Sequence, residues 1–70
     1  MNIPELKAAI ARRGTTNRRI AGHLNISEQA LNNKIKGDSE FKGSEIKALA
    51  ELLHLSMSDV NFIFFDSSVN

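Results

Sequence analysis

Apolar residues recur at helical spacing from the beginning of the chain. Leu6 and Ala9 lie three residues apart and start one apolar stripe. Pro4 precedes them, and proline suits the first turn of a helix because its fixed backbone angle is already helical. Gly14 follows the stripe and is a typical helix stop. The pattern therefore predicts a first helix over residues 3–13.

Two shorter stripes follow, separated by a polar break. They predict helices over 17–24 and 28–36, whose inward positions are Ile20, Ala21, Leu24, Leu31 and Ile35. Asn25 stands in the break, and asparagine adopts the left-handed conformation of a sharp turn more readily than most residues. Ser27 is a favourable N-cap for the later helix, and Gly37 is a favourable stop.

The C-terminal half contains one strong stripe and one short one. Ser44 is the expected N-cap of a fourth helix with apolar positions Ile46, Leu49, Ala50 and Leu53. Ser58 and Asp59 are expected to start a fifth helix that runs through Phe64. The segment 62–65 is also short enough to be extended, so both conformations remain open for it.

No useful length of the chain alternates with the period of two that marks a half-buried strand. We therefore expect an all-α fold, a compact five-helix bundle in a single domain over residues 1–66. Residues 67–70 are polar and are expected to form a frayed tail. Met1 and this polar tail favour a complete small protein over a domain detached from a longer one.

Composition excludes several classes of protein. The 70 residues include no cysteine, which rules out disulfides and thiolate metal sites. No apolar run approaches the roughly 20 residues of a membrane span, and no signal peptide is visible. His23 and His54 fall on different helices without supporting acids, so no metal site is expected. We predict no cofactor and no enzymatic activity, because no nucleophile, base and orienting group occur at suggestive spacings.

Charge is distributed unevenly although the net charge is only +1. Residues 1–36 carry seven Lys and Arg against two Asp and Glu, whereas residues 37–70 carry two against six. The N-terminal half is therefore suited to face a polyanion, although two oppositely biased solvated surfaces would give the same pattern.

The two short helices at 17–24 and 28–36, joined by a turn of three residues, are typical of a helix-turn-helix. Small Ala21 lets the helices cross, and Leu24 and Ile26 are expected to fix their angle. The positions of the second helix that remain outward are Glu28, Gln29, Asn32, Asn33 and Lys36.

This outward set favours contact with DNA bases. Gln29, Asn32 and Asn33 carry amides, which can bind adenine through two hydrogen bonds. Glu28 can accept a hydrogen bond from cytosine, and Lys36 can reach a phosphate. Asparagine is also a poor helix former, so two in the middle of a helix lower stability without evident packing benefit. The alternative is an idle polar face.

The run from Asn17 to Ile35 resembles the helix-turn-helix of the phage Cro and repressor superfamily, also called the Xre family. The resemblance covers roughly residues 4–64. Asn17 stands where the family commonly has glutamine, and Asn25 replaces the usual glycine of the turn. Family members are typically five-helix domains that bind operator DNA as dimers. The resemblance also implies a phage or prophage protein in the cytoplasm of a bacterial host.

Placed on that fold, further residues are expected to bind phosphate. Asn17 and Arg18 lie at the start of the helix over 17–24, where free N–H groups attract anions. Lys42 and Ser44 are expected to hold a second phosphate at the start of the fourth helix. With Lys36, these residues form the predicted contacts to the DNA backbone.

The C-terminal aromatic residues predict an association surface. Val60, Ile63 and Phe64 are expected in the core, which leaves Phe62 and Phe65 partly exposed as a dimer or partner interface. The alternative is that the segment folds back as core filler.

Two functions remain open at this point. The first is a Cro-like transcriptional regulator that binds double-stranded operator DNA as a homodimer, at least on DNA. The second is an antirepressor or modulator that binds a partner repressor protein through the same fold. Steep salt dependence of DNA binding would separate the first from the second.

Overall fold

The computed structural model describes residues 1–65, which form helices joined by short turns and contain no strand. In chain order the elements are α1 (Ile3–Arg13), α2 (Asn17–Leu24), α3 (Glu28–Lys36), α4 (Gly43–Leu53), α5 (Met57–Val60) and the π-helical segment η1 (Asn61–Phe65). The radius of gyration is 11.0 Å, close to the value of about 11 Å for a folded chain of this length. The all-α prediction is confirmed. The predicted domain end at Asp66 and the tail 67–70 lie outside the described residues.

The first three helices have the predicted bounds because their ends are capped locally. The side chain of Asn2 accepts a hydrogen bond from the amide of Glu5, which starts α1. Thr16 and Ser27 accept in the same way at the starts of α2 and α3. Asn25 ends α2 in the left-handed conformation, with φ 60°. These caps turn the chain between α2 and α3 within three residues.

The start of α4 differs from the prediction. Its N-cap is Lys42, so Ser44 lies inside the first turn and is not the cap. The carboxylate of Glu45 accepts a hydrogen bond from the amide of Lys42 at 2.7 Å. This bond is one half of a capping box and fixes the amide of Lys42, while the amides of the first helical turn receive no acceptor from it.

The fifth helix also starts earlier than predicted. Ser56 is the N-cap of α5, and Ser56 and Asp59 bond each other's amides in a reciprocal capping box. The chain then continues into η1 instead of becoming extended at 62–65. The extended alternative for this segment is wrong.

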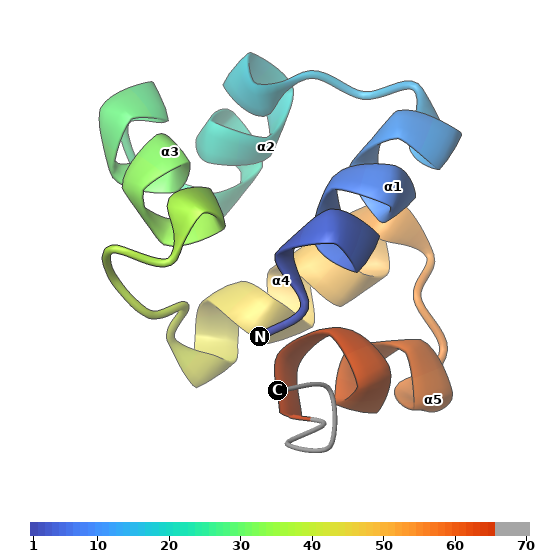
Figure 1. The fold of residues 1–70 in the computed structure, drawn as a ribbon. Helices are drawn as coiled ribbons and strands as arrows, with labels where there is room; N and C mark the ends of the chain where they lie inside the picture. Colours follow the sequence, from blue (N-terminus) through green and yellow to red (C-terminus); the bar gives the residue numbers. More distant parts are fainter. Residues whose placement is uncertain (66–70) are drawn as a thin grey trace.

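The core is formed by one side of each main helix and by η1. Its buried apolar residues are Leu6, Ala9, Ile20, Ala21, Leu24, Leu31, Ile35, Phe41, Leu49, Leu53 and Ile63. The amide of Asn2 donates to the carbonyl of Ile63, which joins the beginning of α1 to η1. Figure 1 shows α3 beside α2 at one end of the molecule, with the following loop (yellow-green) leading to α4. One long face of α3 is thereby left uncovered.

Candidate nucleic-acid interface

The uncovered face of α3 carries the residues predicted to contact bases. Glu28, Gln29 and Asn32 are exposed, and Asn33 is half-buried. Leu31 and Ile35 on the opposite face are buried and hold the helix to the core. Ala21 is buried, and Ile26 packs against the core, so the junction between α2 and α3 is filled as predicted. The side-chain amides of Gln29 and Asn32 are therefore exposed to solvent on a helix that the core holds in place.

Two hydrogen bonds orient these amides. Asn17 Nδ2 donates to Asn32 Oδ1 at 3.1 Å, across the gap between α2 and α3. Gln29 Nε2 donates to Asn33 Oδ1 at 3.2 Å, along one face of α3. Each pair leaves one amide oxygen and amide hydrogens unused, and these groups can bond to base edges or phosphates. The sequence reasoning placed Asn17 at a phosphate and missed its bond to Asn32.

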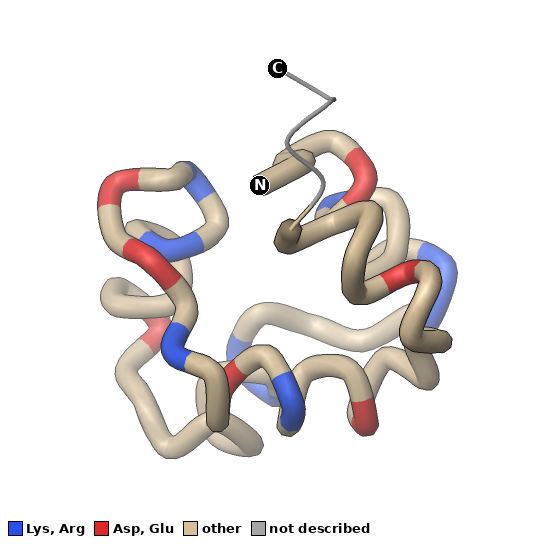
Figure 2. The backbone as a smooth tube through the Cα atoms, turned by 90° about the horizontal axis from the view of Figure 1, so that it is seen from below, with Lys and Arg blue, Asp and Glu red and all other residues tan. Residues whose placement is uncertain are grey.

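The predicted phosphate-binding side chains come from the start of α2, the end of α3 and the start of α4. Arg18, Lys36, Lys42 and Ser44 are all exposed. Lys36 Nζ lies 3.7 Å from Asp38 Oδ2, but both side chains are largely exposed, and such a pair is too weak to withhold Lys36 from a phosphate. In Figure 2 basic and acidic positions are interspersed along the backbone.

The start of α4 is less open to a phosphate than the sequence suggested. The amide of Lys42 is already bonded to the carboxylate of Glu45, so it is unavailable to an anion. Glu45 also places a negative charge in the first turn. What remains for a phosphate at this position is the exposed ammonium of Lys42, the hydroxyl of Ser44 and the first helical amides, which lack intrahelical partners.

Glu45 is buried, which sequence reasoning did not foresee, and it is ionised through its partners. Burial alone would raise the pKa of its carboxyl. The amide of Lys42 and the ammonium of Lys34 bond the charged form, and together they hold the pKa below its ordinary value. Lys34 Nζ lies 3.0 Å from Glu45 Oε1. The spacing of Lys34, three residues after Leu31, was the one sequence signal that it faces inward.

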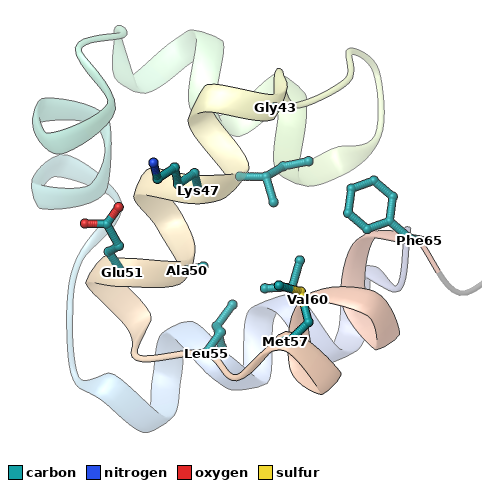
Figure 3. Close-up of a pocket in the computed structure, with 9 residues that line it drawn as sticks. Gly43, Lys47, Ala50, Glu51, Leu55, Met57, Val60 and Phe65 are labelled. Atoms are coloured by element: carbon teal, nitrogen blue, oxygen red, sulfur yellow. The ribbon is translucent and has the colours of Figure 1, made fainter.

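An open apolar groove of about 420 Å³ lies between α4 and the C-terminal segments, on a different set of residues (Figure 3). Its apolar lining is Ile46, Ala50, Leu55, Met57, Val60 and Phe65. Met57 is 76% exposed and Phe65 is 63% exposed. Phe62 is 44% exposed but is not among the lining residues. The predicted exposure of Phe62 and Phe65 is confirmed, whereas the groove brings Phe65 together with Met57 and not with Phe62.

Val60, Ile63 and Phe64 were predicted to lie in the core. Of these three, Ile63 is buried there. Phe64 is half-buried and packs against that core, with its ring 5.7 Å from the ring of Phe41 in an edge-to-face arrangement. Val60 is only half-buried and lines the groove instead. The apolar residues of α5 and η1 are thus divided between the core and the open groove.

The structure was also searched for metal-binding clusters and membrane-spanning helices, and the chain was compared with known proteins. Within residues 1–65, no three His, Cys, Asp or Glu side chains gather where they could bind a metal ion. No helix in that range combines the length and apolar character needed to cross a bilayer. Comparison with protein-family models, curated proteins and solved structures gave no match to this chain.

Proposed function

We propose that the chain is a sequence-specific regulator that binds double-stranded DNA and has the helix-turn-helix of the phage Cro and repressor type. The main support for this proposal is the exposed face of α3, where the side-chain amides of Gln29 and Asn32 lie beside half-buried Asn33. A helix of this kind fits the major groove, and glutamine and asparagine can read base edges there. Glu28 lies on the same face and is suited to a cytosine amino group.

The backbone of the duplex is held from both sides of α3 in this arrangement. Asn17 and Arg18 bind one phosphate at the start of α2, where the first helical amides lack intrahelical partners. Lys36, Lys42 and Ser44 bind phosphates at the other end of α3 and beyond it. These contacts set the register of the helix in the groove, while the amides select the bases.

A second copy of the chain is the proposed occupant of the apolar groove. Lys47 and Glu51 lie on α4 along the side of the groove opposite Phe65 (Figure 3). Neither belongs to an ion pair within residues 1–65. If two copies pack their α4 helices antiparallel about a two-fold axis, Lys47 of each copy lies opposite Glu51 of the other, which gives two equivalent charge pairs. The rim is therefore self-complementary, and a dimer would offer two α3 helices to successive major grooves, about 34 Å apart.

Selection of bound duplexes from a random pool tests this proposal. Gln29→Ala should weaken binding to the selected duplex by about 1–3 kcal/mol and relax base preference at one position. Lys42→Ala should instead weaken binding to selected and random duplexes alike and flatten the salt dependence. If the wild-type protein binds no duplex even near 50 mM salt, the DNA proposal is wrong and binding of a partner repressor becomes the better account.

This alternative, an antirepressor or modulator, is favoured by the apolar groove and by the low net charge of +1. It predicts binding to a repressor protein that hardly responds to salt. The cytoplasm of a bacterial host remains the location that the phage resemblance proposes under either function.

A further inference from the structure

The side chain of Lys34 crosses from the recognition helix α3 to the start of α4. Its ammonium lies 3.0 Å from Glu45 Oε1 and donates to the carbonyl of Glu40 at 3.0 Å. It also lies 6.0 Å from the centre of the Phe41 ring, within the range of a cation–π contact. Of the three hydrogens of the ammonium, two therefore have oxygen acceptors, and the Phe41 ring lies at the edge of the cation–π range.

Glu45 completes the connection on the other side. The same oxygen that receives Lys34 also accepts the amide of Lys42 at 2.7 Å. The side chains of Lys34 and Glu45 are only 12% and 9% exposed. One buried carboxylate thus joins the last turn of α3 to Lys42, the residue that ends the loop and carries a proposed phosphate contact.

The ion pair between Lys34 and Glu45 connects two helices that otherwise make little contact. α3 packs chiefly against α2 and α1, whereas Lys34 reaches α4 through its side chain. A buried ion pair commonly contributes no more net stability than apolar residues of similar volume, because both charges must leave water. Its directional bonds do, however, admit few orientations of the elements that they join.

We infer that Lys34 and Glu45 are a positioning pair that sets the spacing between the base-contacting face of α3 and the phosphate-contacting Lys42. The inference rests on the proposed DNA binding. A rigid spacing lets the phosphate contact place the amides of Gln29 and Asn32 against the correct base edges. A loose spacing would keep the attraction of Lys42 for its phosphate but let that contact shift the amides away from the base edges, whereas loss of the Lys42 side chain removes the attraction alone.

The test compares Lys34→Met with the double variant Lys34→Met/Glu45→Gln. The single variant leaves a buried carboxylate without its cation and should lower the urea midpoint. The double variant removes both charges, keeps an acceptor for the amide of Lys42 and should regain much of that midpoint. Lys7→Met, at an exposed position on α1, is the matched control for loss of one positive charge.

The decisive measurement is the ratio of affinities for the selected and the random duplex. This ratio should fall about tenfold in both Lys34 variants, the loss expected for one misplaced base contact. Affinity for the random duplex should match that of the Lys7→Met control. If the double variant regains the wild-type ratio together with stability, or if Lys34→Met never changes it, the pair is merely structural and the inference is overturned.

Hydrogen exchange without DNA separates this inference from the proposed function. In both Lys34 variants the amides of Asp38 and Lys42 should exchange at least about tenfold faster, while that of Ile26 in the α2–α3 turn keeps its rate. Unchanged loop exchange overturns the positioning role whatever the DNA results are. Faster loop exchange in a protein that discriminates no duplex supports the positioning of the loop and refutes the DNA proposal instead.

Discussion

Asn17 Nδ2 donates a hydrogen bond to Asn32 Oδ1 at 3.1 Å, so the first residue of α2 restrains a side chain in the middle of α3. Both residues are exposed. A bond between two exposed neutral groups adds little stability because water competes for both partners. Its consequence is geometric, since it limits the directions in which the amide of Asn32 can point.

The first prediction concerns this bond. Asn17→Ala should leave the free energy of unfolding within about 0.5 kcal/mol of wild type, because it removes only exposed contacts. It should weaken binding to the selected duplex by about 1–2 kcal/mol, since a phosphate contact and the restraint on Asn32 are lost together. Fluorescence anisotropy on a labelled duplex measures the affinity, and urea unfolding measures the stability.

Asn61→Ala is the matched control, because Asn61 is exposed at the start of η1, outside the proposed interface. It should leave DNA affinity unchanged. Equal affinities for Asn17→Ala and Asn61→Ala would show that α2 makes no contribution to binding through Asn17.

Local signals explain why α2 and α3 were predicted with the correct bounds. Asn25 and Ser27 act on amides and carbonyls within a few residues, so their roles can be read without knowledge of the tertiary fold. At α4 the same reasoning selected Ser44 because serine is a better cap than lysine. It failed because the carboxylate of Glu45 reaches back to the amide of Lys42.

The remaining site features depend on contacts between distant parts of the chain. Lys34 and Glu45 are residue types that usually face water, and only the path of the intervening loop brings them together in the interior. The groove needs α4 and α5 to be placed before Met57 and Ala50 can be seen on one surface. Spacing along one helix contains no information on either arrangement.

The second prediction concerns the left-handed residues that end α2 and α4. Asn25 has φ 60° and His54 has φ 55°. Asn25→Ala should destabilise the protein by about 1 kcal/mol, because an alanine Cβ is strained there, whereas Asn25→Gly should be neutral or slightly stabilising. Urea midpoints measure the difference. The pair His54→Ala and His54→Gly should show the same order, and an alanine variant as stable as its glycine counterpart would contradict the strain argument.

The third prediction concerns the proposed dimer. Wild-type protein should self-associate weakly without DNA, and sedimentation velocity over a range of concentrations measures it. Lys47→Glu or Glu51→Lys alone should weaken association about tenfold, since each puts like charges opposite one another across the two-fold axis. The double variant Lys47→Glu/Glu51→Lys should recover the association, and so should an equimolar mixture of the two single variants.

Met57→Glu should abolish that association by placing a carboxylate in the apolar groove. Folding of every variant is checked by circular dichroism. A wild-type protein that stays monomeric at the highest concentration, or single charge variants that associate as well as wild type, would show that the groove does not bind a second copy.

The last prediction concerns acid. Burial would raise the pKa of Glu45, but the amide of Lys42 and the ammonium of Lys34 lower it below its ordinary value. The amide and hydroxyl of Ser56 lower the pKa of Asp59. A carboxyl whose pKa is lower in the folded state binds its proton more readily when unfolded, so its contribution to stability is complete above the unfolded pKa of about 4.

That contribution is lost as the pH falls through the folded pKa, and urea midpoints should therefore decline steeply below about pH 4. Glu45→Gln should lower the midpoint at neutral pH and make the acid decline shallower, because the variant has no carboxyl to protonate. Glu40→Gln, at an exposed position in the loop before α4, should keep the wild-type slope. Equal acid slopes for Glu45→Gln and wild type would mean that the buried carboxylate is not stabilised by Lys34 and the amide of Lys42, and the ion pair that joins α3 to α4 would lose its energetic basis.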